Sequence, residues 1–103
     1  MSELHITKDN FEQLVVASQK PVLLDFWATW CGPCRMIAPL VAQIAEERED
    51  IVVGKINVDE EMELAARFGI VSIPTLVVMK DGKPAAKAVG YMPKADIEKL
   101  LDQ

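Results

Sequence analysis

Residues 22–28 (VLLDFWA) form a nearly unbroken apolar run, and this run limits the choice of fold more than any other part of the chain. A strand with one wet face alternates between apolar and polar residues, whereas a continuous apolar run is typical of a strand covered on both faces. Residues 36–48 then carry apolar side chains at the spacing of one helix face. A buried strand that leads into a helix predicts an α/β protein with helices on both faces of a sheet.

The rest of the chain alternates in the same way. A second buried strand is predicted at residues 51–58, and right-handed crossovers make it a parallel neighbour of the first. The other predicted elements are a short strand at Ile6, a helix at residues 9–18 capped by Asp9, a helix at residues 60–68 ended by Gly69, a hairpin of residues 75–79 and 85–89 turning at Asp81–Gly82, and a closing helix at residues 94–101. At this length we expect one domain, residues 1–103, built on a mixed sheet.

Charge and apolar patterning exclude several kinds of partner. Sixteen acidic and eleven basic residues give a net charge of −5 without a basic cluster, so we expect no nucleic-acid ligand. The first ten residues lack the basic region and apolar run of a secretory signal, and the apolar runs elsewhere are too short to span a membrane. We therefore expect no membrane partner and, if Met1 is the true start, a cytoplasmic location.

Two cysteines, Cys31 and Cys34, lie at the junction between the predicted strand and the predicted helix. Helical positions i and i+3 lie about 5–6 Å apart at Cβ, so a disulfide can open and close there with little backbone movement. Unpaired N–H groups at a helix start favour the nucleophilic thiolate at Cys31. Cys34 lies further into the helix, where burial keeps its thiol protonated. We therefore expect Cys31 to attack a substrate disulfide and Cys34 to resolve the mixed disulfide.

Gly32 and Pro33, between the cysteines, favour a reductant. Gly32 lets another backbone come close, and Pro33 lacks an N–H that the first helical turn does not need. A histidine there would stabilise the thiolate further and make the pair more oxidising. Two alternatives stay open for this motif. The cysteines could pack by chance in a core, or they could bind a metal, although structural zinc takes four ligands and the one histidine, His5, is distant in sequence.

Asp25 is the one charged residue in the run at residues 22–28, and Lys55 is the only other charge in a buried-looking strand. Desolvation should raise the pKa of a carboxyl group in such a place, which suits it to relay a proton near neutral pH. We predict that Asp25 takes the proton of Cys34 during resolution, directly or through a water, with Lys55 as its partner on the neighbouring strand. The alternative is an Asp25 that faces an edge and a Lys55 that reaches solvent.

The segment WATWCGPCR at residues 27–35 resembles the active-site motif of the thioredoxin family, and the similarity covers essentially the whole chain. The further residues that carry it are Asp25, Phe26, Pro39, Lys55, Asp59, Phe68, Gly69, Ile70, Ile73, Pro74, Thr75, Asp81, Gly82 and Gly90. The resemblance implies the thioredoxin fold, a central five-stranded mixed sheet flanked by four helices. It also implies a cis peptide bond before Pro74, which would lie beside the dithiol.

Substrates and partners are implied by the same resemblance. An apolar groove would hold an extended segment of a disulfide-containing protein, and a thioredoxin reductase would recharge the dithiol. The groove residues would be Trp30, Gly32, Pro33, Ile73, Pro74, Val89 and Gly90. We expect a monomer that uses no cofactor beyond the Cys31–Cys34 disulfide. Ser72 and Tyr91 depart from the family pattern, where glycine and a small residue are common, and core packing is the alternative role for Trp27 and Trp30.

The predicted function is a protein-disulfide reductase that acts as a general dithiol electron donor. Two other functions stay open at this point. One is a non-catalytic binding subunit with the same fold, and the other is a dimer bridged by a metal. The presence of Cys31, Cys34 and Asp25 weighs against a purely binding role.

Overall fold

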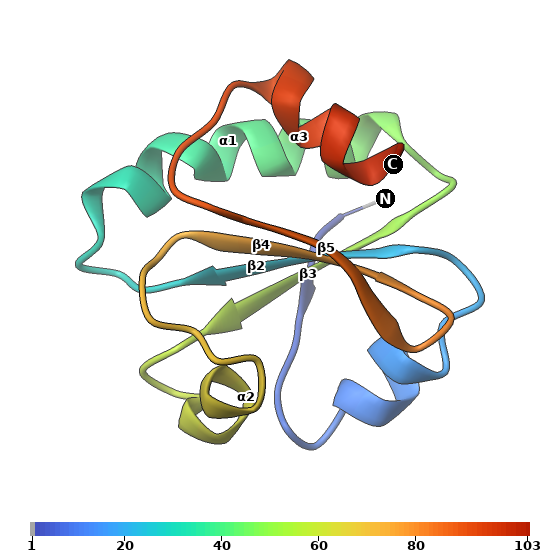
Figure 1. Ribbon diagram of the computed structural model, residues 1–103, viewed down its shortest axis with the longest axis horizontal. Helices are drawn as coiled ribbons and strands as arrows, with labels where there is room; N and C mark the ends of the chain where they lie inside the picture. Colours follow the sequence, from blue (N-terminus) through green and yellow to red (C-terminus); the bar gives the residue numbers. More distant parts are fainter. Residues whose placement is uncertain (1) are drawn as a thin grey trace.

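The computed structural model describes residues 2–103 and contains five strands, three α-helices and one π-helical turn, η1 (Figure 1). The elements in chain order are β1 (Leu4–His5), η1 (Glu12–Val16), β2 (Val22–Trp27), α1 (Gly32–Glu47), β3 (Val52–Asn57), α2 (Met62–Arg67), β4 (Thr75–Lys80), β5 (Lys83–Val89) and α3 (Lys94–Leu101). None of the helices in this described range is both long and apolar enough to cross a membrane.

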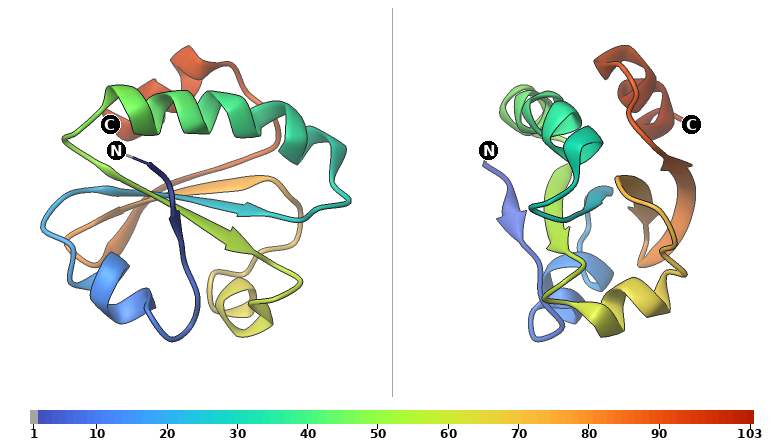
Figure 2. Two further views of the ribbon diagram at one scale, coloured as in Figure 1. Left: turned by 180° about the vertical axis from the view of Figure 1, so that it is seen from behind. Right: turned by 90° about the vertical axis from the view of Figure 1, so that its left-hand side faces the viewer.

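The five strands form one sheet in the order β1-β3-β2-β4-β5. β3 is parallel to both β1 and β2, whereas β4 is antiparallel to β2 and β5 is antiparallel to β4. α1 and α3 cover one face of the sheet, and η1 and α2 cover the other (Figure 1 and Figure 2). The mixed sheet, its covered faces and the parallel β2–β3 pair confirm the predicted fold class. The central strand, β2, leads directly to the start of α1.

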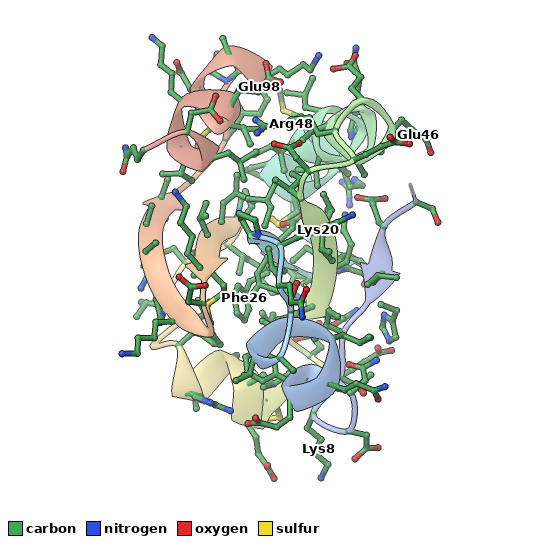
Figure 3. All side chains as sticks on the ribbon, turned by 90° about the vertical axis from the view of Figure 1, so that its right-hand side faces the viewer. Lys8, Lys20, Phe26, Glu46, Arg48 and Glu98 are labelled. Atoms are coloured by element: carbon green, nitrogen blue, oxygen red, sulfur yellow. A yellow bond between two sulfur atoms is a disulfide. The ribbon has the colours of Figure 1, made fainter. Side chains whose placement is uncertain are left out.

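β2 is buried on both faces, as its apolar run predicts. Leu23 belongs to the apolar cluster beneath α1 and α3, whereas Leu24 and Phe26 belong to the cluster on the opposite face. All three side chains are fully buried, and burying one side chain of this size stabilises a fold by about 1.5–3 kcal/mol. Figure 3 shows Phe26 between the layers, with Lys8 and Glu46 on the outside. This packing holds the start of α1 in a fixed place at the end of β2.

The N-terminal helix is shorter than predicted. The pattern predicts a helix capped by Asp9, but η1 spans only Glu12–Val16 and its N-cap is Phe11. Two side chains bond to the local backbone before the helix starts. Asn10 Oδ1 accepts from the Thr7 N–H at 2.8 Å, and Thr7 Oγ1 accepts from the Asp9 N–H at 3.2 Å. Such turn-type bonds compete with helical ones, so the helix begins after Asn10.

β1 also differs from its prediction, because it spans Leu4–His5 and Ile6 follows it. Ile6 is still fully buried, and its N–H donates to the carbonyl oxygen of Lys55 at 2.9 Å. Gly54 permits this close approach, since a Cβ added there would lie 2.7 Å from Ile6 Cγ1. The N-terminal segment is thereby held tightly along β3, next to the charged pair predicted at the centre of the sheet.

The hairpin forms at the predicted place. Asp81 and Gly82 connect β4 to β5 with φ angles of 53° and 78°. Two consecutive positive φ angles make the kind of two-residue turn whose twist matches that of the flanking strands. The β4–β5 pairing shifts register between Val78 and Met79. β4 therefore starts next to Pro74, and its other end leads into the Asp81–Gly82 turn.

Candidate active site

Cys31 and Cys34 lie where β2 meets α1, as their spacing predicts. Cys31 is the N-cap of α1, and Cys34 lies in its first turn. The two are joined by a disulfide with a Cα–Cα distance of 5.2 Å. Both residues are buried, with Cys31 4% exposed and Cys34 2% exposed. The helix start therefore holds the two sulfurs at bonding distance without a longer loop between them.

The environment of Cys31 Sγ favours a negative charge. Sγ accepts a hydrogen bond from the backbone N–H of Cys34 at 3.1 Å, which is the capping bond of α1. Unpaired amides at a helix N-terminus and the helix dipole both stabilise an anion at this position. A thiolate formed here on reduction is therefore held by the start of the helix, and a thiolate is the attacking species in disulfide exchange.

Gly32 and Pro33, between the buried cysteines, lie at the surface of the protein. A Cβ added at Gly32 would meet no other atom within 4 Å, so internal packing does not require glycine there. Pro33 is exposed, and it occupies the first turn of α1, where a missing N–H costs no helical bond. The backbone of another chain can therefore come close to these two residues.

Asp25 is fully buried and faces Lys55. The two residues are direct neighbours in the parallel β2–β3 pairing, and Lys55 Nζ lies 3.2 Å from Asp25 Oδ2. Burial raises the pKa of the Asp25 carboxyl, and the ammonium of Lys55 opposes that rise. The Lys55 side chain is only 17% exposed. The alternative of an edge-facing Asp25 and a solvated Lys55 is therefore wrong.

Two further groups surround the Lys55 ammonium. It lies 5.3 Å from the centroid of the Trp27 ring and 4.0 Å from Glu3 Oε2. Glu3 was not among the residues predicted for this site. No local sequence pattern identifies it, because the contact depends on the pairing of β1 with β3, in which His5 lies opposite Lys55 and Glu3 is two residues before His5. Residues two apart along a strand share a face, so Glu3 lies on the side of the sheet that carries Lys55.

A pocket of about 250 Å³ lies beside the dithiol and Lys55. Its lining includes both Cys34 and Lys55, and the remaining lining residues are Trp27, Ala28, Thr29, Arg35 and Ala38. A water molecule takes up about 30 Å³ of liquid volume, so several can occupy this space. The pocket thus places accessible space beside both Cys34 and Lys55, the ion-pair partner of the buried Asp25.

The segment before β4 lies against the disulfide. The Ile73–Pro74 peptide bond is cis, which confirms what the resemblance implies. The carbonyl oxygen of Ile73 lies 3.7 Å from Cys31 Sγ, and Ile73 packs on the cluster that contains both cysteines. Gly90 donates its N–H to the carbonyl oxygen of Pro74 at 2.8 Å. The end of β5 is thereby joined to the cis-proline segment beside the sulfurs.

Two large apolar side chains of the predicted groove are exposed. Trp30 is 67% exposed and Val89 is 58% exposed. Core packing as the role of Trp30 is therefore wrong, whereas Trp27 is half-buried over Lys55. The indole N–H of Trp30 donates to Asp59 Oδ2 at 2.9 Å, which fixes its ring beside Cys31. The apolar surface next to the disulfide is thus present and unfilled by the chain itself.

The departures from the family pattern lie on the surface near this site. Ser72 is exposed, and its carbonyl oxygen accepts from Thr75 Oγ1 at 2.6 Å. Tyr91 is 47% exposed. Among residues 2–103, no group of three or more His, Cys, Asp or Glu side chains could hold a metal ion. The redox group that this part of the chain presents is the Cys31–Cys34 disulfide.

Comparison with known proteins indicates one family over the whole described chain. The family model that matches is Thioredoxin, over residues 2–103. The chain is 50% identical to thioredoxin of Alicyclobacillus acidocaldarius over 97 residues, which cover 93% of this chain and 91% of that protein. It is 50% identical to thioredoxin of Mycobacterium tuberculosis, covering 95% of this chain and 85% of the other. It is 47% identical to thioredoxin of Haemophilus influenzae, covering 100% and 98%.

The disulfide lies at the start of a helix, in a chain that is very similar to these thioredoxins. Both facts argue against a purely structural role for it. The redox-active pair, the fold and the extent of the similarity all indicate the same chemistry. The chain belongs to the thioredoxin family and is a thiol–disulfide oxidoreductase, a protein-disulfide reductase whose redox centre is Cys31–Cys34.

Proposed function

We propose that the protein is a general dithiol electron donor in which Cys31 attacks and Cys34 resolves. The observation that carries this assignment is the capping bond, because the Cys34 N–H stabilises charge on Cys31 Sγ. The Cys31 thiolate attacks a substrate disulfide, and one substrate thiolate leaves as the mixed disulfide forms. Cys34 then attacks Cys31 Sγ, which restores the Cys31–Cys34 bond and releases the second thiolate. The substrate gains two electrons and the dithiol loses two.

Asp25 is the proposed acceptor of the Cys34 proton. Its raised pKa lets it hold a proton that a surface aspartate would not, and the pocket lined by Cys34 and Lys55 supplies room for bridging water. Lys55 balances the charge of Asp25 when the proton is absent, since its ammonium lies 3.2 Å away. The pair therefore serves the resolution step, in which the Cys34 thiol must become a thiolate.

Substrates are proposed to bind as extended segments over the groove that the resemblance implies. Its residues are Trp30, Gly32, Pro33, Ile73, Pro74, Val89 and Gly90. The exposed apolar side chains of Trp30 and Val89 support contact without a requirement for a particular sequence. The open space at Gly32 supports close approach of the substrate backbone. Disulfide-containing proteins are therefore the proposed substrate class.

The assignments of domain, oligomeric state, location and partner are based on membership of the family. We propose that residues 1–103 act as one domain and as a monomer in the cytoplasm, recharged by a thioredoxin reductase and needing no added cofactor. Membership of the family supports the reductase partner. The match over residues 2–103 supports one domain.

The test of this function is turnover on a fluorogenic peptide whose single disulfide holds a quencher beside a fluorophore. With dithiothreitol as the electron source, catalytic amounts of the protein should reduce many equivalents of peptide. The reduction potential of Cys31–Cys34, measured against a glutathione buffer, should be more negative than that of glutathione. Lack of turnover would favour a binding subunit, and a more oxidising potential would overturn the reductant. Stoichiometric zinc in the purified protein would instead favour the metal-bridged dimer.

Val89→Glu should weaken binding of protein substrates without impairing the dithiol. Val89 is 58% exposed at the end of β5, and losing the burial of one such side chain should raise KM for the peptide about tenfold. Reduction of the small hydroxyethyl disulfide should stay unchanged. Ala85→Glu is the matched control, because Ala85 is exposed on the same strand and gains the same charge. Equal changes at the two positions would contradict the groove.

A further inference from the structure

We propose that Glu3 is a positioning residue of the proton path. Glu3 shares Lys55 with Asp25 and thereby sets the pH range in which Asp25 accepts the proton of Cys34. The inference rests on the proposed function, because it concerns the same resolution step. It adds a residue that lies outside the motif around the cysteines and at the opposite end of the chain from β4 and β5.

The sheet places Lys55 between two carboxylates. β3 is flanked by β1 on one side and by β2 on the other, with His5 and Asp25 as the residues paired with Lys55. Glu3 precedes His5 by two residues and shares its face. Lys55 Nζ lies 3.2 Å from Asp25 Oδ2 and 4.0 Å from Glu3 Oε2. One ammonium therefore faces two carboxyl groups that come from opposite sides of its strand.

Glu3 is not an ordinary surface glutamate. Its Oε2 atom is buried and has no hydrogen-bond partner among the described residues, although the side chain as a whole is 27% exposed. Burial raises the pKa of Glu3, Lys55 opposes that rise, and the charge of Asp25 adds to it. Glu3 and Asp25 share the Lys55 ammonium, so their titrations are coupled through it.

The number of charges in this cluster determines how tightly Asp25 holds its proton. A single positive charge cannot neutralise two carboxylates, so the full ionisation of both leaves a net negative charge in a largely buried place. Like charges disfavour each other's ionisation, and the last proton of such a pair is held more tightly than a lone carboxylate would hold it. With Glu3 ionised, Asp25 is therefore a stronger base toward the Cys34 thiol than Lys55 alone would allow.

Few other titratable groups lie near Asp25, and the basic ones among them have other partners. α1 contributes Cys34 and Arg35, and the Arg35 guanidinium donates to the Thr29 carbonyl oxygen. β1 contributes His5, whose Nε2 lies 4.0 Å from the carboxylate of Glu60, beyond the end of β3. From β4, the residue paired with Asp25 is the apolar Leu76. Across residues 2–103, Lys55 is the one cation within ion-pair distance of Asp25.

The experiment compares Glu3→Gln with the unchanged protein. The readout is single-turnover release of substrate thiol from the Cys31 mixed disulfide, measured as a function of pH. Removing the charge of Glu3 should lower the pKa of Asp25, so the acid limb of the profile should move to lower pH by about half a unit or more, a roughly threefold faster release on that limb. A carboxyl carbon NMR titration of Asp25 should show the same shift. Glu3→Asp, which keeps the charge, should move the profile less.

Three controls distinguish the role of Glu3 from that of Asp25 and from a general effect of net charge. Glu63→Gln changes the net charge equally at an exposed carboxylate that lies 4.0 Å from Lys8, and it should leave the profile unchanged. On an Asp25→Asn background, Glu3→Gln should produce no further shift. An unchanged profile in Glu3→Gln, with a profile altered by Asp25→Asn, would overturn the role of Glu3 alone. No effect of Asp25→Asn would overturn the proton path as well, and with it the proposal for Glu3.

Discussion

Cys34→Ser is expected to turn the reductase into a trap that stays covalently bound to its substrates. The attacking sulfur remains at the N-cap of α1, where the backbone N–H of residue 34 still supports its thiolate. The first exchange therefore proceeds, but no second sulfur lies within reach to release the substrate. Steady-state turnover of the disulfide peptide should fall by at least about 10³-fold, as expected when a residue of the bond-making machinery is lost. Non-reducing electrophoresis and mass spectrometry should show one substrate attached to Cys31.

Cys31→Ser is the matched control for this experiment. It removes the same kind of atom from the same helical turn, and both cysteines are buried to a similar degree. It should abolish turnover and form no adduct, because Cys34 lies inside the first turn without the capping amides. Adducts that form through Cys34 in Cys31→Ser, and not through Cys31 in Cys34→Ser, would reverse the roles of the two sulfurs.

Asp25→Asn is expected to slow resolution and, at the same time, to stabilise the fold as the pH rises. Loss of the proton acceptor should lower the rate of thiol release near neutral pH by roughly 10²-fold, a typical contribution of one general base. The effect should disappear at alkaline pH, where Cys34 ionises without help. Single-turnover release from the mixed disulfide, followed across pH, measures both limbs. A rate profile identical to that of the unchanged protein would remove Asp25 from the mechanism.

The stability effect has a definite sign. Burial raises the pKa of Asp25 above its usual value of 3.8, so the folded protein binds this proton more tightly than the unfolded chain does. The associated stability is full below pH 3.8 and is lost as the pH rises through the pKa of the folded state. Relative to the unchanged protein, Asp25→Asn should gain up to about 1.4 kcal/mol per pH unit inside that window and nothing further above it. Urea unfolding at several pH values measures this difference.

Much of this arrangement could be predicted from local pattern. The run at residues 22–28 predicts β2 because a strand buried on both faces has no polar side to alternate with. Asp81 and Gly82 predict the hairpin because both tolerate the positive φ angles that the turn requires. Cys31 and Cys34 predict their own disulfide because their spacing of three residues is close to one helical turn. Each of these depends only on residues that are close together in the sequence.

Other features depend on contacts that no local pattern contains. The start of η1 is decided by bonds from the side chains of Thr7 and Asn10, which compete with helical bonds that the apolar spacing favours. Glu3 meets Lys55 only through the pairing of β1 with β3, about fifty residues apart in the chain. The cis bond before Pro74 came from family resemblance alone, because most bonds before proline are trans.

The two outer strands of the sheet bear on whether the protein aggregates through its edges. β1 spans only two residues, and β5 carries exposed Lys83, Pro84 and Lys87 beside an irregular register with β4. Short, charged or proline-bearing edges are poor templates for the addition of another strand. Another extended chain therefore finds few backbone groups to pair with along the rim of the sheet, which limits aggregation through these edges.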